Sequence, residues 1–72
     1  MKIYKDNFGN TAKIERVEIL PYKDAPDKVT GYRLIVTSDY DNDFIYHVSV
    51  YETFTDAKVE LNKLSMGTFK EV

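Results

Sequence analysis

Cysteine and tryptophan are absent from this 72-residue chain, and histidine occurs once. Without cysteine neither a disulfide nor a cysteine-ligated zinc site can form, so two usual ways of stabilising a small domain are closed. Dense packing and self-association are the remaining ways to stabilise such a domain. The absence of cysteine also favours an intracellular, cytoplasmic location, because structural disulfides are characteristic of oxidising compartments.

Glycine is scarce, and Gly9, Gly31 and Gly67 stand far apart. Neither a phosphate-binding loop nor a dinucleotide-binding fingerprint can be built from isolated glycines. Long hydrophobic runs are also missing. No segment approaches the roughly 18 consecutive apolar residues of a membrane span, and the N-terminus lacks the apolar core of a signal peptide. We therefore expect a soluble protein without a membrane partner.

Neither sign of charge dominates, since ten basic side chains oppose twelve acidic ones and the net charge is −2. Both signs are scattered along the chain, so overall charge does not recruit nucleic acid. The length allows one domain, residues 1–72, which buries only about 60% of the surface that its unfolded chain exposes. The core is therefore expected to be thin.

Four β-strands are indicated by alternating apolar residues between clusters of turn formers. They are expected at residues 1–5, 11–22, 29–37 and 44–51. The turn at 6–10 is rich in residues that tolerate positive φ and makes a hairpin of the first two strands. Residues 23–28, with several charges and Pro26, suit an exposed connection.

The second strand is the most ambiguous segment, because it has apolar residues at both parities. These residues are Ala12, Ile14, Val17 and Ile19. A β-bulge near residues 15–16 would bring both pairs to one face, and we expect one there. A helix over residues 11–20 is the alternative, but the missing wide apolar stripe and the following Pro21 favour a strand.

A helix is predicted over residues 55–64, directly after the fourth strand. Thr53 or Thr55 can cap its first turn, where Asp56 also suits the helix dipole. A stripe of Ala57, Leu61 and Leu64 can lie on the sheet, with Phe54 at its start and Gly67 as a left-handed cap at its end. The tail at 68–72 is either a frayed end or a short edge strand held by Phe69.

This order of elements, β-β-β-β-α, predicts an α+β domain. Its sheet is four-stranded and mainly antiparallel, with the C-terminal helix on one face and a short final strand as an option. If the helix covers the face of Leu34, Val36, Phe44, Tyr46, Val48 and Val50, the opposite face stays open. We expect that open face to carry Arg33, Ile35, Ile45, His47 and Tyr51, joined by Val17 and Ile19.

Motifs for catalysis or metal binding are incomplete in this chain. Residues 39–43 begin like a calcium loop, but Phe44 replaces the expected glycine and Val50 stands where a bidentate glutamate is needed. His47 and Ser49 share a strand without a glycine-rich elbow to expose a nucleophile. We therefore predict no cofactor, no metal and no catalytic residue, and an enzyme or metal protein is the least favoured class.

The open face predicts a non-enzymatic interaction or regulatory module, because a patch richer in aliphatic side chains than a solvated surface invites a protein partner or a second copy of the chain. The alternative is a single-stranded nucleic-acid binder. Six tyrosines could stack on bases, with Lys13, Arg16 and Arg33 on phosphates. The strand and helix order is similar to that of transcriptional coactivators that bind single strands, but the interleaved acidic residues make nucleic acid the less favoured partner.

Overall fold

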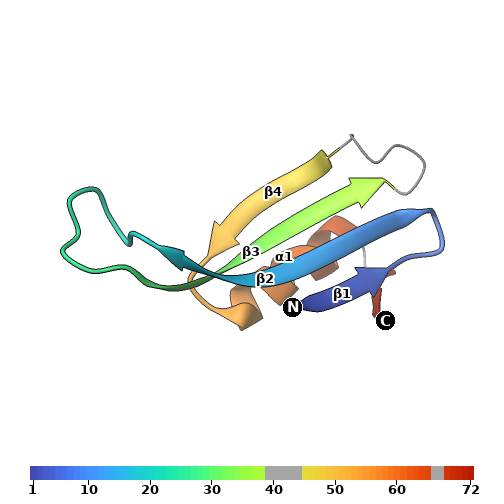
Figure 1. The fold of residues 1–72 in the computed structure, drawn as a ribbon. Coiled ribbons are helices and arrows are strands. Elements are labelled where there is room, and N and C mark those ends of the chain that lie inside the picture. The colour runs from blue at the N-terminus through green and yellow to red at the C-terminus, as the bar shows by residue number, and fades with distance from the viewer. Residues whose placement is uncertain (39–44, 66–67) are drawn as a thin grey trace.

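An antiparallel sheet with one helix on its face forms the fold of the computed structural model, which describes residues 1–38, 45–65 and 68–72 (Figure 1). The elements along the chain are β1 (Lys2–Lys5), β2 (Asn10–Ile19), β3 (Val29–Ser38), β4 (Ile45–Tyr51), α1 (Phe54–Ser65) and β5 (Lys70–Glu71). The strands lie in the order β4-β3-β2-β1-β5. The predicted α+β class is confirmed, and the tail adds the short final strand.

The turn between β1 and β2 is organised by the carboxylate of Asp6. Its Oδ1 accepts hydrogen bonds from the backbone N–H groups of Phe8 and Asn10, both at 2.9 Å, and its Oδ2 accepts one from Asn10 Nδ2 at 2.9 Å. Gly9 follows with a positive φ of 82°, a conformation that favours glycine. The predicted hairpin is thus closed by an aspartate that satisfies the turn amides.

β2 is a regular strand along its full length, so the predicted bulge near residues 15–16 is wrong. Every residue from Asn10 to Ile19 pairs with β3 in unbroken register. No bulge is needed, because the even-numbered and odd-numbered apolar residues of β2 lie on opposite faces of the sheet. Ala12 and Ile14 are buried on the side of α1, whereas Val17 and Ile19 lie on the opposite side. The strand prediction for residues 11–20 is confirmed over the helical alternative.

An irregularity occurs instead in β4, at Tyr46. Val36 pairs with His47 and Thr37 pairs with Ile45, which leaves Tyr46 as an extra residue between them. Such a bulge shifts the alternation of side chains by one position. Ile45 therefore lies on the same face as Val48 and Val50, although its number has the other parity.

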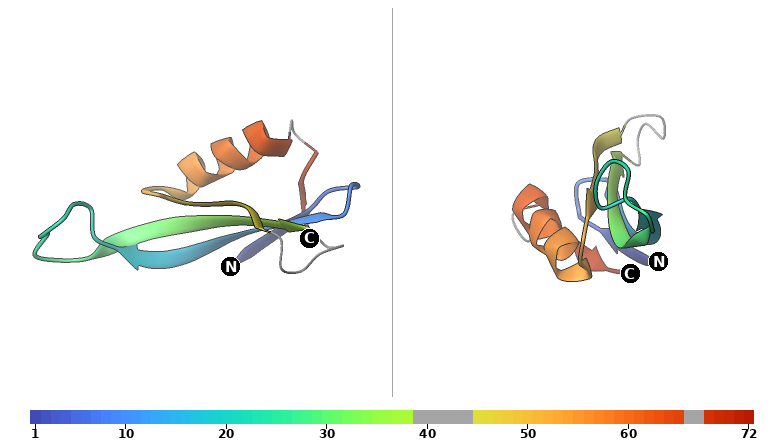
Figure 2. Two further views of the ribbon diagram at one scale, coloured as in Figure 1. Left: turned by 90° about the horizontal axis from the view of Figure 1, so that it is seen from above. Right: turned by 90° about the vertical axis from the view of Figure 1, so that its left-hand side faces the viewer.

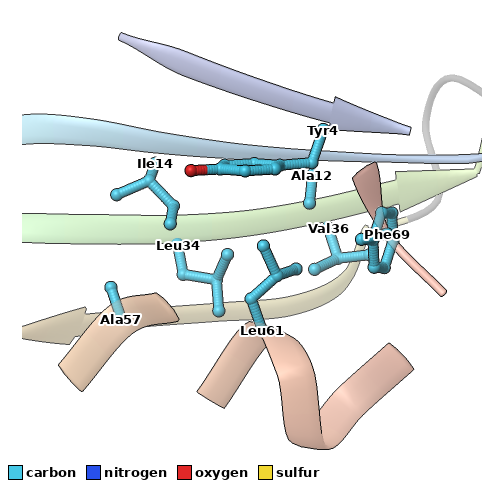
Figure 3. Packing of buried hydrophobic residues seen from close by; sticks show 8 residues of the cluster. All are labelled: Tyr4, Ala12, Ile14, Leu34, Val36, Ala57, Leu61 and Phe69. Atoms are coloured by element: carbon cyan, nitrogen blue, oxygen red, sulfur yellow. The ribbon is translucent and has the colours of Figure 1, made fainter. Parts of the chain in front are cut away.

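The core lies between α1 and the central strands (Figure 3). Among the described residues it comprises eight buried apolar side chains: Tyr4, Ala12, Ile14, Leu34, Val36, Ala57, Leu61 and Phe69. Ala57 and Leu61 are four residues apart in α1, and both point at the sheet. Phe69 holds the tail against this cluster, as the sequence predicted, whereas Leu64 of the predicted stripe remains 45% exposed.

The helix begins with the capping arrangement that the sequence indicated. The backbone N–H of Asp56 donates to Oγ1 of Thr53 at 3.1 Å, and the N–H of Ala57 donates to the carbonyl oxygen of Thr53 at 3.2 Å. Thr53 therefore acts as the N-cap, and Asp56 places its carboxylate in the first turn of α1.

The distal end of the β2–β3 hairpin projects beyond α1, as the left view of Figure 2 shows. The molecule is accordingly elongated, with principal extents of 42 × 24 × 18 Å. The connection at its tip is exposed, as expected for residues 23–28, and contains Asp24 at a positive φ of 67°. In the part of the chain that the structure describes, no helix covers either face of this projecting end.

Some expectations from the sequence lie outside the described residues. They are the calcium-like residues 39–43, the place of Phe44 on the sheet and the cap at Gly67. Within the described ranges no helix has the length and apolar character needed to cross a membrane.

Candidate interaction face

The open face is the side of the sheet opposite α1. Residues that are Cα partners in neighbouring strands point to the same face of a sheet. Arg33 and Ile35 pair with Val50 and Val48 on one side, and with Glu15 and Lys13 on the other. Since Leu34 between them is buried under α1, Arg33 and Ile35 face away from the helix.

Three of the five predicted interaction residues lie on this face, and two do not. Arg33, Ile35 and Ile45 are on the open face. His47 and Tyr51 pair with Val36 and Tyr32 and therefore point to the side of α1. Tyr51 packs against the core. Their assignment to the open face is wrong because the register of β4 against β3, with its extra residue, reverses the expected faces.

Val48 and Val50 take the positions that His47 and Tyr51 were expected to hold. Together with Ile35 and Ile45 they form the apolar patch, a contiguous group at the junction of β3 and β4. Ile45, Val48 and Val50 are 53%, 52% and 46% exposed. Ile35 is half-buried in the middle of the sheet. The patch is entirely aliphatic and adjoins the outer edge of the sheet.

An ion pair borders the apolar patch. Nη2 of Arg33 lies 2.6 Å from Oε2 of Glu15, its partner across the β2–β3 ladder. The Nε atom of Arg33 is buried without a hydrogen-bond partner. Beyond this pair, Val17, Ile19 and Val29 continue the open face along the projecting hairpin. The Arg33–Glu15 pair therefore separates two aliphatic areas.

The opposite end of the open face is basic. Lys5 pairs with Lys70 of β5, and Lys13 lies beside Ile3 of β1 and Ile35 of β3. Nζ of Lys5 donates a hydrogen bond to Oγ1 of Thr11 at 3.0 Å. We call Lys5, Lys13 and Lys70 the basic group. On the described part of this face the basic group and Arg33 are accompanied by one acidic residue, Glu15. The face is therefore positive, although the chain as a whole has a net charge of −2.

The two edges of the sheet differ. β5 is two residues long and consists of Lys70 and Glu71, and Glu71 forms a 3.0 Å ion pair with Lys2. β4 is seven residues long and contains neither Lys, Arg, Asp, Glu nor Pro. In the described part of the chain no strand pairs with its outer side. Residues 47–51 of β4 thus present an edge that no described strand pairs with, beside the apolar patch.

His47 and Tyr51 contact each other on the helix side, where His47 Nε2 lies 3.3 Å from the hydroxyl oxygen of Tyr51. His47 therefore has a tyrosine hydroxyl as its neighbour, which can donate to or accept from the ring depending on the tautomer. Across the described residues, no group of three His, Asp or Glu side chains is placed to hold a metal ion.

A groove of about 560 Å³ opens on the helix side, between the β1–β2 turn and the end of α1. Its walls are mainly apolar and include Phe8, Val36, Leu64 and Phe69. The other lining residues are Asp6, Asn10, Tyr46, His47 and Thr68. Burial alone would raise the pKa of Asp6, but the hydrogen bonds from Asn10 and from the turn amides lower it below the ordinary value of 3.8. The carboxylate of Asp6 that lines the groove is therefore already engaged by hydrogen bonds within the β1–β2 turn.

Sequence reasoning named Lys13 as a candidate phosphate contact but missed Val48, Val50 and the other two members of the basic group, Lys5 and Lys70. The bulge at Tyr46 has no clear signal in the sequence, so the face of each β4 residue could not be assigned. Lys5 and Lys70 are 65 positions apart in the chain and meet only because β5 returns to pair with β1. The lack of charge in β4 was visible in the sequence, but its position at the edge was not.

Comparison of the chain with known protein families, with curated protein sequences and with solved structures finds no match. The functional assignment therefore rests on the surface chemistry of the chain itself.

Proposed function

We propose that the chain is a non-enzymatic protein-interaction module that docks a partner protein on its open face. The observation that carries the proposal is the apolar patch of Ile35, Ile45, Val48 and Val50, which no described element covers. Burial of aliphatic surface contributes about 25 cal/mol per Å², so such a patch is a favourable centre for an interface. The neighbouring ion pair and lysines provide the polar surround that protein interfaces need.

The charge of the face favours a partner of particular chemistry. The basic group lies on one side of the apolar patch, across the sheet from β4. A complementary surface has an aliphatic or aromatic centre and acidic residues on the flank that meets Lys5, Lys13 and Lys70. Opposite charges of this kind set the orientation and accelerate association more than they increase affinity.

The position of the aromatic residues favours a protein partner over single-stranded nucleic acid. Tyr4, Tyr32 and Tyr51 lie on the helix side, and the described part of the open face has no aromatic side chain on which a base could stack. Arg16 pairs with Tyr32 and points away from Lys13 and Arg33. The basic residues proposed for phosphate contacts are therefore divided between the two faces.

The test compares two aspartate substitutions at sites of similar exposure. Ile45→Asp places a charge in the apolar patch, and Val59→Asp places the same charge on exposed α1, where the native valine is 47% exposed. Proteins bound by the immobilised chain from lysate are quantified by mass spectrometry. The proposal predicts a protein that is retained by Val59→Asp, lost with Ile45→Asp and weakened by Lys13→Glu. Equal recovery by all variants would contradict it.

Salt and single-stranded DNA distinguish the two classes of partner. Docking on the apolar patch should change little when salt is raised, whereas binding to phosphates weakens steeply. A titration of the labelled chain with mixed-sequence single strands at low salt should leave the chemical shifts of Lys13 and Arg33 unchanged. Salt-sensitive chemical-shift changes at these residues would contradict the proposal and favour single-stranded nucleic acid as the partner.

A further inference from the structure

We infer that β4 pairs with β4 of a second copy of this chain, in antiparallel orientation, to give one continuous sheet. The site of contact is the backbone edge of β4, whereas the proposed function uses side chains on the open face. The inference goes beyond that function and stands on its own observations: the length, composition and position of this edge strand.

The composition of the edge is the first observation. Sheets protect their free edges with charges, with proline, with bulges or with very short strands. The β5 edge has such protection, being two residues long with Lys70 and Glu71. The bulge in β4 lies at Tyr46, near the start of the strand, and residues 47–51 pair with β3 in regular register. β4 has seven residues without any formally charged side chain or proline, and Ile45, Val48 and Val50 are about half exposed beside the unpaired backbone. An edge of this kind is suited to pairing with another strand.

Self-complementarity identifies the second copy as the occupant. An antiparallel pair related by a two-fold axis places each residue opposite a symmetric position of the same strand. With the axis at Val48, each Val48 meets its own counterpart and His47 meets Ser49, all within the part of β4 that follows the bulge at Tyr46. No like charges are opposed, because β4 has no Lys, Arg, Asp or Glu.

The position of the helix and of the charges allows this arrangement. The axis stands perpendicular to the joined sheet, so both helices lie on one side and both open faces on the other. α1 contacts β3 more than any other strand and also contacts β4 and β2, all from the helix side of the sheet. The basic group is on β1, β2 and β5, away from the seam, so the two clusters of lysines stay apart. The two apolar patches become one continuous surface of eight residues.

Charge swapping at the axis tests this pairing. Val48→Lys puts two lysines opposite each other and should reduce the mass in sedimentation equilibrium from that of a dimer to that of a monomer. Val48→Glu should do the same. An equimolar mixture of the two variants should restore the dimer mass, because the introduced lysine and glutamate face each other only if position 48 is on the axis. Circular dichroism checks that both variants fold, as expected at a site that is 52% exposed.

The control position is Ile35, which is in the same patch but on β3. Ile35→Lys should retain the dimer mass while blocking the partner proposed above, so failure of the edge pairing and failure of the proposed function give different results. Hydrogen exchange supplies a backbone readout: alternate amides of β4 should become protected at high concentration and lose that protection on dilution.

Three results would overturn the inference. The first is a wild-type chain that remains monomeric at all concentrations up to about 1 mM, where even a dimer held by only about 4 kcal/mol would be populated. The second is a dimer that survives Val48→Lys. The third is a dimer abolished by Ile35→Lys and not restored by mixing the Val48 variants, which would indicate pairing through the open faces.

Discussion

Ile19 closes over Gly31 on the open face. A β-carbon built on Gly31 would lie 2.7 Å from Cδ1 of Ile19 and 3.1 Å from its Cγ1. Gly31 does not have a positive φ. Lack of space for a side chain, and not backbone conformation, is therefore the reason for glycine at this position. The isoleucine fills the place of the missing side chain and keeps the base of the projecting hairpin covered.

Gly31→Ala is therefore expected to lower the free energy of unfolding by about 1 kcal/mol, because Ile19 must leave its preferred rotamer to admit the methyl group. Urea denaturation of the single variants and of the double variant measures this effect. In the Ile19→Ala background the same change should cost nothing or stabilise slightly, since alanine is better than glycine in a strand. A cost that persists in that background would show that the clash is with another group.

Asp6 makes the stability of the β1–β2 turn depend on pH. Burial would raise the pKa of its carboxyl, but the hydrogen bonds from the Asn10 side chain and the turn amides outweigh it and lower the pKa. A carboxyl with a lower pKa in the folded state than in the unfolded state stabilises the fold above the unfolded value. This contribution is lost as pH falls from about the ordinary value of 3.8 through the lower folded value.

We accordingly expect the free energy of unfolding to decrease through this acidic range, and Asp6→Asn to flatten part of the decrease. Chemical denaturation at a series of pH values between neutral and strongly acidic measures both curves. Asp27→Asn removes an exposed carboxylate from the hairpin tip and is the matched control. Equal pH dependence for Asp6→Asn and Asp27→Asn would count against the role of the turn.

At the scale of elements, α1 depends on its N-cap and on one apolar stripe. Oγ1 of Thr53 accepts a hydrogen bond from the backbone N–H of Asp56 in the first turn. The apolar residues by which α1 packs on the core are Phe54, Ala57 and Leu61. A helix of 12 residues is marginal by itself in water, so its start and its packing must both support it.

Thr53→Ala should destabilise the protein by about 1 kcal/mol, the usual cost of removing a hydroxyl N-cap. Thr55→Ala is the control, because Thr55 is an exposed threonine two residues further along, inside the helix. Thermal denaturation followed by circular dichroism compares the two variants. A larger loss for Thr55→Ala than for Thr53→Ala would place the cap at Thr55, which the sequence also allowed.

The sheet shows at the same scale why faces are harder to predict than strands. Each strand was found close to its expected bounds, because alternation and turn residues are local signals. The bulge at Tyr46 depends on how β4 meets β3, so it could not be recognised from β4 alone. One extra residue was enough to exchange His47 and Tyr51 for Val48 and Val50 on the open face.

At the scale of the whole molecule, the core is thin because a single described helix, α1, packs on one face of the sheet. Among the described residues eight apolar side chains are buried in it, and Ala57 and Leu61 are the two that α1 contributes. A chain of this size is expected to have a stability of about 4–11 kcal/mol at 0.05–0.15 kcal/mol per residue. One large truncation therefore removes much of the total, and association with a second copy would add to it.

Leu61→Ala is predicted to lower the free energy of unfolding by about 3 kcal/mol, since Leu61 is completely buried and its removal leaves a cavity. Val59→Ala, on the exposed side of the same helix, should change it by less than about 0.5 kcal/mol. Urea denaturation at several protein concentrations measures both. Similar losses for the two variants would mean that α1 is not held by the face that contacts the sheet.

The sequence by itself determined the elements, their order and the α+β class, because helix and strand periodicity, turn chemistry and the Thr53 cap act between neighbouring residues. It also indicated that Phe69 would hold the tail if the tail formed an edge strand and not a frayed end, and that Arg33, Ile35 and Ile45 would share the open face. The tertiary structure decided what depends on contacts between distant segments: the bulge in β4, the unbulged register of β2, the meeting of Lys5 with Lys70, and the exposed position of an uncharged strand at the edge. Strand pairing sets these features, and a single residue of register reverses a face, so no local pattern could specify them.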